Sequence, residues 1–153
     1  MISPELLRRY PFFGFMGDAQ LKAIAMIAEE STYEKGQPIF DANQPANTLY
    51  FLEAGSASNY FIVKDGGKPV KELYIGDINP GDIFGISALI EPYIYTATMR
   101  AEKTCRVIKI DASALRALCE VDLKLSCGLQ RAVAKATMER LQSTRVQLVA
   151  ATN

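Results

Sequence analysis

The middle of the chain reads as a series of short strands, and this pattern limits the fold more than any other feature of the sequence. β-rich runs alternate with turn residues at intervals of about ten residues. Asp65-Gly66-Gly67 predicts a hairpin turn, because glycine adopts the positive φ angles that such a turn requires. About eight strands in about 80 residues are typical of a jelly roll, the double-stranded β-helix. The runs lie near residues 31–34, 37–41, 48–54, 57–64, 69–75, 82–84, 95–101 and 104–110.

Helical patterns flank this β-rich region. Ser3-Pro4-Glu5 predicts the start of a short helix that Tyr10-Pro11 ends, and Asp18 is expected to cap a second helix. From Asp111 onward the pattern is helical again. We therefore expect a single mainly β domain over residues 1–153, with N-terminal helices, a β-roll and C-terminal helices at residues 1–30, 31–110 and 111–153.

The last of these helices is long and has two apolar faces. It is expected to run from Leu123 to about Ala150, with Asp122 as its cap. One face has the 4-3-4-3-4-3 spacing of a coiled-coil stripe. We call it the heptad seam, and it consists of Cys127, Arg131, Ala134, Met138, Leu141, Arg145 and Leu148. The second face consists of Leu125, Leu129, Ala132, Val133 and Ala136.

Two apolar faces on one helix need two partners. We expect the β-roll to cover the second face, and the same helix of a second copy to cover the heptad seam. The result would be a homodimer through the C-terminal helix. A single broad stripe that faces the core is the alternative. The interface would be made by the apolar members of the heptad seam, namely Cys127, Ala134, Met138, Leu141 and Leu148.

The chain contains no histidine, and this absence excludes much chemistry. Nucleophiles of the Ser-His-Asp and Cys-His kinds are ruled out, and so are zinc and haem sites that use histidine ligands. We therefore expect no catalytic residue, metal site or cofactor. Cys105, Cys119 and Cys127 have no C-x-x-C spacing, and we expect them to be small buried apolar residues.

Charge and hydropathy limit the surroundings in which the chain works. Lys+Arg and Asp+Glu both number 17, so no excess charge favours nucleic acid. No apolar run approaches the roughly 18 residues that a membrane helix needs. The first 13 residues, MISPELLRRYPFF, do not have the pattern of a signal peptide. We therefore expect a cytoplasmic protein without a membrane association.

Residues 76–101 carry a second informative pattern. A strand signal leads into the turn Pro80-Gly81-Asp82, and a short apolar turn follows Gly85. A loop that contains Pro92 then opens into an alternating strand, which is expected to run from Tyr95 to Ala101.

This stretch and the order of the other elements resemble the cyclic-nucleotide-binding domain superfamily, and most of all the sensor domains of its catabolite-activator/fumarate-nitrate-regulator group. The resemblance covers nearly the whole chain. It implies a jelly-roll fold and a regulatory function without enzymatic activity. The matching residues are Leu7 with Tyr10-Pro11-Phe12-Phe13 and Leu21, residues 33–40, Leu49-Tyr50-Phe51-Leu52 with Gly55, residues 80–85, and Arg100-Ala101 with Cys105.

The resemblance also implies a phosphate-binding cassette at residues 81–97. In relatives that bind cyclic nucleotides, a glutamate holds the ribose hydroxyl and an arginine pairs with the cyclic phosphate. Here Ile86 stands at the glutamate position and Tyr95 at the arginine position, so both charged groups are missing. The candidate ligand contacts are Gly85, Ile86, Ser87, Ala88, Tyr95, Thr96 and Ala97, with Ser143 and Thr144 on the long helix as candidates beside a base.

Three states of this cassette stay open from the sequence. In the first, the cassette is vestigial and Ile86, Tyr95 and their neighbours fill its cavity. In the second, it binds another small molecule, with Tyr95 as a phenol donor and Ile86 as an apolar wall. In the third, it binds a cyclic nucleotide through another arrangement. The sequence does not identify the small-molecule effector.

The function expected from the resemblance is that of a regulatory sensor module in signal transduction, which acts through dimer or partner contacts. A ligand-free scaffold or dimerisation module is the alternative. An enzyme of the cupin kind shares the fold in outline, but its metal site needs histidines. The sequence ends at Asn153 with no recognition helix after the long helix, so we do not expect specific DNA binding. We expect a protein partner near Leu148 and Val149 instead.

Overall fold

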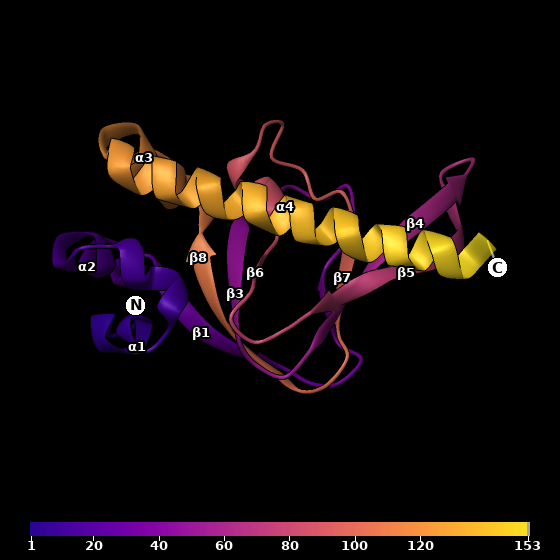
Figure 1. Cartoon of the computed structure of the whole chain (residues 1–153), viewed down its shortest axis with the longest axis horizontal. Coiled ribbons are helices and arrows are strands. Elements are labelled where there is room, and N and C mark those ends of the chain that lie inside the picture. Colours follow the sequence, from indigo (N-terminus) through magenta and orange to yellow (C-terminus); the bar gives the residue numbers. More distant parts are fainter. Residues whose placement is uncertain (153) are drawn as a thin grey trace.

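The computed structural model describes residues 1–152, in which a β-roll lies beside the N-terminal helices and beneath a long C-terminal helix (Figure 1). Over these residues eight strands form two four-stranded antiparallel sheets, with the orders β1-β8-β3-β6 and β2-β7-β4-β5. The expected mainly β fold with flanking helices is confirmed. The strands are β1 (Ala28–Tyr33), β2 (Pro38–Phe40), β3 (Thr48–Ala54), β4 (Ala57–Asp65), β5 (Lys68–Ile78), β6 (Ile83–Phe84), β7 (Thr98–Ala101) and β8 (Cys105–Asp111).

The N-terminal segment forms three short helices, and their caps show why they begin where they do. The Ser3 hydroxyl accepts a hydrogen bond from the Glu5 backbone N–H at 3.1 Å, as the sequence predicts. The prediction that Asp18 caps the second helix is wrong by one residue. Gly17 is the cap, and the Asp18 carboxylate pairs with Arg8 at 2.8 Å. The helices are α1 (Pro4–Arg8), the 3-10 helix η1 (Pro11–Phe15) and α2 (Asp18–Met26).

Aromatic rings join this segment to the first sheet. Phe13 of η1 and Phe51 of β3 are fully buried, and their ring centroids lie 5.1 Å apart. Tyr10 and Phe12 contact the same Phe51 ring, with centroid distances of 4.9 and 5.7 Å. Buried aromatic pairs contribute both apolar area and a preferred geometry. The N-terminal helices are therefore part of the core.

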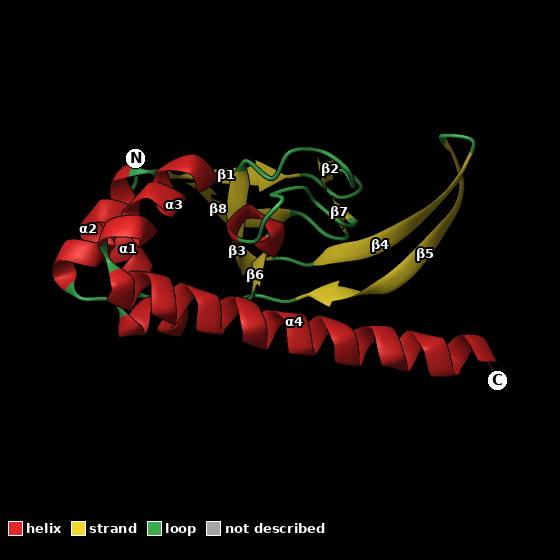
Figure 2. Cartoon of the chain, turned by 90° about the horizontal axis from the view of Figure 1, so that it is seen from above, coloured by secondary structure: helices red, strands yellow, loops and turns green. Residues whose placement is uncertain are grey.

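Strands β4 and β5 continue beyond the roll as a long hairpin (Figure 2). Its two-residue turn consists of Gly66 and Gly67, with φ angles of 59° and 81°. Positive φ at both positions is what a hairpin turn of this length requires, so the predicted turn is confirmed.

Strand β7 begins later than the alternating pattern predicts. The expected start was Tyr95, but the strand begins at Thr98. The backbone of Tyr95 pairs with the loop after β2, where Asn43 N–H donates to the Tyr95 carbonyl at 2.8 Å and Tyr95 N–H donates to the Gln44 carbonyl at 3.0 Å. The segment before β7 therefore lies in a loop–loop contact outside the second sheet.

Two helices, α3 (Ala112–Val121) and α4 (Leu123–Thr152), complete the chain. Asp111 caps α3 by accepting from Ala114 N–H at 2.9 Å, and Asp122 caps α4 by accepting from Leu125 N–H at 3.0 Å. Helix α4 runs the length of the molecule, past the roll and along the β4–β5 hairpin (Figure 2). Within residues 1–152, no helix has both the length and the apolar character that crossing a membrane requires.

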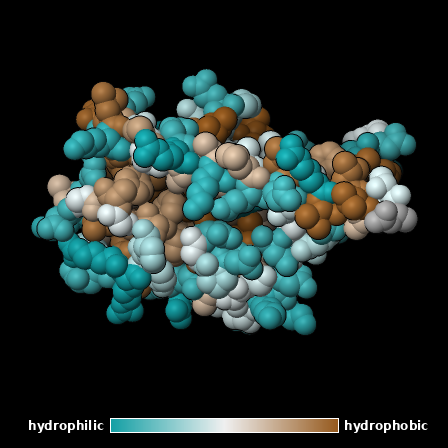
Figure 3. Space-filling model, in the orientation of Figure 1, coloured by the Kyte–Doolittle hydropathy of each residue, from teal (hydrophilic) through white to brown (hydrophobic). Residues whose placement is uncertain are grey.

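The two apolar faces of α4 lie in different surroundings. The face that contains Leu125, Leu129, Val133 and Ala136 is buried. The heptad seam faces away from the roll, and Met138 is 71% exposed and Leu148 62% exposed. The alternative of one broad stripe facing the core is therefore wrong. Apolar residues gather toward the C-terminal end of α4 on the molecular surface (Figure 3).

The exposure of each cysteine follows from its position in these elements. Cys105 in β8 is buried as expected, and Cys119 is half-buried. The predicted burial is wrong for Cys127, which is exposed because it lies on the heptad seam of α4.

Candidate functional site

A cavity of about 400 Å³ lies between the cassette, the second sheet and α4. Every predicted cassette contact except Ala88 lines it, and Ala88 is fully buried in the core. Helix α4 closes the cavity opposite the cassette with Thr137 and Arg140. The complete lining consists of Phe40, Asn59, Phe61, Ile75, Phe84, Gly85, Ile86, Ser87, Tyr95, Thr96, Ala97, Met99, Thr137 and Arg140.

Gly85 sets the path of the chain where the cassette enters the cavity wall. Its φ of 69° is left-handed, a conformation that glycine adopts without a steric penalty. A Cβ at this position would lie 3.1 Å from the Tyr50 ring and 3.2 Å from the Thr48 carbonyl oxygen. The backbone then turns into the 3-10 helix η2 (Ile86–Leu89), which brings Ile86 and Ser87 to the cavity.

Tyr95 stands at the position expected for the phosphate-binding arginine, and its side chain is buried and hydrogen-bonded in the core. It is 4% exposed, and its ring stacks on Phe40 with a centroid distance of 3.9 Å. The Tyr95 hydroxyl donates to the Thr48 carbonyl at 2.6 Å and accepts from the Thr48 N–H at 3.3 Å. Burial raises the pKa of Tyr95 to about 12. The phenol is therefore neutral and its one proton is already donated, so the interpretation of Tyr95 as a donor to a ligand is wrong.

The other arginine near the cassette in sequence does not reach the cavity. Arg100 in β7 forms an ion pair with Glu72 of β5, in which Nη1 lies 2.8 Å from Oε2. Its guanidinium also stands over the Tyr60 ring, 5.0 Å from the centroid. Arg100 therefore holds β7 to the hairpin and does not replace the missing cassette arginine.

Arg140 is the cation of this cavity, and the sequence analysis missed it. Its guanidinium donates to the backbone carbonyls of Ile83 in β6 and Ala136 in α4. Burial lowers the pKa of Arg140, although a guanidinium remains charged at neutral pH. The spacing of Val133, Ala136 and Arg140 continues the roll-facing side of the helix, and extending that face by one turn would have found it.

The two helix residues predicted beside a base lie further along α4. Ser143 packs against Gly76 of β5, where a built Cβ on the glycine would be 2.9 Å from the Ser143 Cβ. Thr144 donates to the Arg140 carbonyl at 2.8 Å and lines a separate groove with Leu73 and Tyr74. Thr137 and Arg140 occupy the wall that was predicted for Ser143 and Thr144. A ligand contact by Ser143 or Thr144 stays a prediction.

Comparisons with known proteins place this fold in one family. The sequence model of the cyclic nucleotide-binding domain matches residues 30–122. The chain is similar to a crystal structure from Geobacter metallireducens GS-15 named as a cyclic nucleotide-binding protein, with 40% identity and a TM-score of 0.77 over 92% of this chain and 99% of that one. The N-terminal domain of a transcriptional regulator from Streptomyces coelicolor A3(2) is 25% identical, with a TM-score of 0.65 over 88% of this chain and 93% of that one.

Two further relatives are longer proteins. The catabolite activator protein of Thermus thermophilus is 20% identical, with a TM-score of 0.65 over 93% of this chain and 63% of that one, and it shares the fold. A potassium channel protein of Rhodopseudomonas palustris is 23% identical over 118 residues, which are 77% of this chain and 27% of the channel protein. The chain thus spans about a quarter of the length of that relative. From the matched residues and the similar structures, the chain belongs to the cyclic nucleotide-binding domain family.

Proposed function

We propose that this chain is a regulatory sensor domain that forms a homodimer through α4 and binds cyclic AMP and cyclic GMP weakly or not at all. The observation that carries the proposal is the bonding of Tyr95. The residue at the arginine position is a buried, neutral phenol whose proton goes to the Thr48 carbonyl. It offers no charge and no free donor to a cyclic phosphate.

The missing contacts are large enough to decide affinity. A hydrogen bond between charged partners contributes roughly 1.5–3 kcal/mol, and the cassette lacks both the arginine and the glutamate that make such bonds in relatives. Every 1.4 kcal/mol changes a dissociation constant about tenfold. The loss of both contacts would therefore move a micromolar ligand to about the millimolar range.

The cavity favours a sensor over the ligand-free scaffold. A vestigial cassette would be filled by its own side chains, but a volume of about 400 Å³ stays between Ile86, Tyr95 and α4. Pockets of roughly this size, with mostly apolar walls and a few polar groups, are typical of small-molecule sites. We therefore propose a divergent pocket for an effector that is not a cyclic nucleotide.

The output of the domain would pass through α4. The heptad seam is exposed on the side of the helix opposite the roll, which suits pairing with a second copy. A ligand that binds between the roll and α4 would favour one position of the helix and so shift the population of dimer arrangements. The similar proteins include the N-terminal domain of a transcriptional regulator and a protein named as a potassium channel, so related domains occur in proteins of different kinds. For this chain we propose a single domain in the cytoplasm with a protein partner.

Isothermal titration of the purified chain with cyclic AMP and cyclic GMP tests the ligand part of the proposal. We expect dissociation constants of about 1 mM or weaker, and a low-micromolar value for either nucleotide would overturn it. The double variant Ile86→Glu, Tyr95→Arg restores both charges. Because the cavity is open, we expect cyclic AMP affinity to appear in this variant, whereas Ile86→Glu alone should stay weak.

A further inference from the structure

The cavity contains an arginine that has no acidic partner. Over residues 1–152, Arg140 makes no ion pair within 4.0 Å, in contrast to Arg8, Arg100 and Arg106. Asp82 and Glu139 are the acidic groups whose charges act on it, and both lie beyond that distance. Its hydrogen bonds go to the Ile83 and Ala136 carbonyls. Charged groups that leave water are normally paired, and no carboxylate of residues 1–152 lies close enough to pair with this guanidinium.

A second polar group in the same cavity also lacks a partner. Asn59 of β4 is 9% exposed and lines the cavity. Its side-chain carbonyl oxygen, Oδ1, has no hydrogen-bond donor among residues 1–152. A buried acceptor without a donor costs free energy, and buried polar groups of this kind are nearly always satisfied in native structures. A hydrogen-bond donor on a bound molecule would satisfy it.

The other walls are largely apolar. Aromatic and aliphatic side chains from β2, β4, β5, β6, the cassette and β7 surround the space beside Arg140. Such walls bind an apolar body by removing its surface from water, at roughly 25 cal/mol per Å² buried. They consist of Phe40, Phe61, Ile75, Phe84, Ile86, Tyr95 and Met99.

We infer that the cavity binds an organic acid whose aromatic or aliphatic body lies among these rings and whose carboxylate or sulfonate pairs with Arg140. A donor group on the body would face Asn59 Oδ1. The anionic end of the ligand thus lies against α4, on the wall opposite the cassette. This inference rests on the proposed function, because it needs a sensor cavity that is not taken by a cyclic nucleotide.

The test uses two fluorescent probes with the same aromatic body, titrated against the whole chain. 8-Anilinonaphthalene-1-sulfonate carries a negative charge, and N-phenyl-1-naphthylamine is neutral. We expect Arg140→Gln to weaken binding of the sulfonate about tenfold or more and to change binding of the neutral probe by less than about twofold. Ala97→Phe, which fills the cavity, should weaken both probes. Arg9→Gln, the same change at an exposed site on the N-terminal segment, should weaken neither.

Three results would overturn the inference. Equal loss of both probes in Arg140→Gln would mean that the charge is not involved, and no loss of either probe would mean that Arg140 is not at the site. Unchanged binding in Ala97→Phe would place the probes elsewhere, for example on the heptad seam. Arg140→Lys keeps a charge, so it should retain more sulfonate affinity than Arg140→Gln, and circular dichroism checks that each variant is folded.

Competition with cyclic AMP separates this inference from the proposed function. Displacement of the sulfonate probe by low-micromolar cyclic AMP would contradict the proposed function. The difference between the charged and neutral probes in Arg140→Gln would still decide whether an anion binds at Arg140.

Discussion

Gly55, which follows β3, is a residue where the backbone leaves no room for a side chain. Its φ is 92°, and a Cβ there would lie 2.2 Å from the Thr104 carbonyl oxygen and 2.9 Å from the Cys105 Cα. Both atoms belong to the backbone, so neither can move without shifting the start of β8. We expect Gly55→Ala to lower the free energy of unfolding by about 3 kcal/mol, measured by urea denaturation.

Variants of two other glycines distinguish the effect of the steric clash from the effect of the backbone conformation. Gly36 has a φ of 84° with no atom within 4 Å of a built Cβ, so Gly36→Ala should cost only about 1–2 kcal/mol. Gly14 also has no neighbour within 4 Å and serves as the baseline. A Gly55→Ala variant as stable as Gly36→Ala would contradict the steric explanation.

Glu30 is a residue whose charge opposes folding as the pH rises. The pKa of Glu30 is raised above 4.5, first by a hydrogen bond shared with Glu53, then by burial and by the Glu53 charge. The side chain of Glu53 is fully buried, and its Oε1 has no donor within residues 1–152. A protonated Glu30 would be able to supply such a donor. A raised folded pKa means that this stabilisation is complete below the unfolded pKa and is lost as the pH rises through the folded value.

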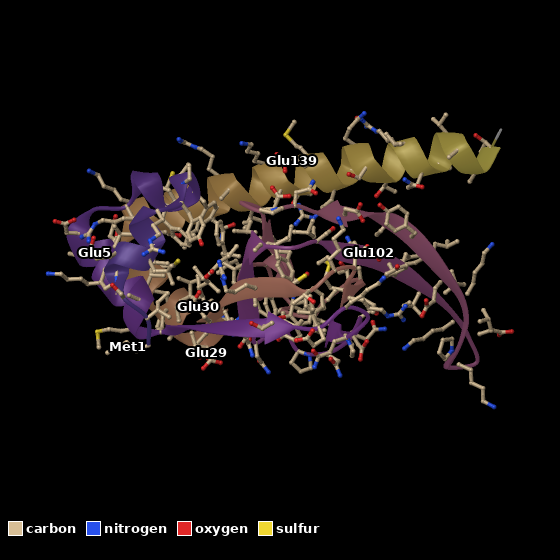
Figure 4. All side chains as sticks on the ribbon, turned by 90° about the horizontal axis from the view of Figure 1, so that it is seen from below. Met1, Glu5, Glu29, Glu30, Glu102 and Glu139 are labelled. Atoms are coloured by element: carbon tan, nitrogen blue, oxygen red, sulfur yellow. The ribbon has the colours of Figure 1, made fainter. Side chains whose placement is uncertain are left out.

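We therefore expect Glu30→Gln, whose amide donates at every pH, to stabilise the protein relative to wild type at about pH 7 and much less at about pH 4. Differential scanning calorimetry at the two pH values measures the change in Tm. Glu29→Gln changes the preceding residue of β1 and is the matched control (Figure 4). A Tm difference between Glu30→Gln and wild type that does not grow with pH would refute the shared proton.

At the level of single residues, the sequence located one side of the cavity and missed the other. Gly85, Ile86 and Tyr95 belong to a local pattern, so their places could be predicted from neighbouring residues. The role of Tyr95 could not, because its bonds to Thr48 join residues 47 positions apart. The spacing of Arg140 from Val133 and Ala136 puts it on the roll-facing side of α4, but the sequence does not fix which turn of that side meets the cavity.

The heptad seam of α4 is an apolar face that has no partner within residues 1–152 of a single chain. Met138 and Leu141 lie at its centre, 71% and 49% exposed. A lysine there would be a charge in the middle of the proposed interface, where unpaired burial is costly. We expect Met138→Lys and Leu141→Lys to be monomers in analytical ultracentrifugation at tens of micromolar, with an unchanged β-rich circular dichroism spectrum.

A matched control exists for this change. Met26 in α2 is 69% exposed, close to the exposure of Met138, but lies on the N-terminal segment. Met26→Lys should leave the dimer intact. Wild-type protein that sediments as a monomer at the same concentration would rule out the dimer.

Elements were predicted well where local pattern decides them and less well where distant contacts do. The caps at Ser3 and Asp122 and the Gly66-Gly67 turn depend on residues within a few positions. The start of β7 depends on the loop at residues 43–44, which takes the backbone bonds of Tyr95. Alternation of apolar and polar residues does not report which segment the backbone pairs with.

The whole molecule carries no net charge that would favour nucleic acid. Its 17 basic and 17 acidic residues cancel, so the general attraction to phosphates that precedes specific recognition is missing. We expect no complex with duplex DNA at physiological salt in the presence of competitor DNA, measured by fluorescence anisotropy. Weak binding that disappears between about 50 and 200 mM salt would agree with this expectation. A tight complex that survives competitor would contradict it.

Arg140 and the heptad seam occupy the same stretch of α4, with Met138 and Leu141 on either side of the arginine in sequence. The cavity and the proposed dimer interface are thus separated by the width of a single helix, about 10 Å. Free energies that couple two sites are reciprocal. If an anion at Arg140 favours dimer formation, the dimer must therefore bind that anion more tightly than the monomer does, by the same free energy. Dilution of the protein would weaken its apparent affinity for its own effector, so the module would respond to its cellular abundance as well as to the effector.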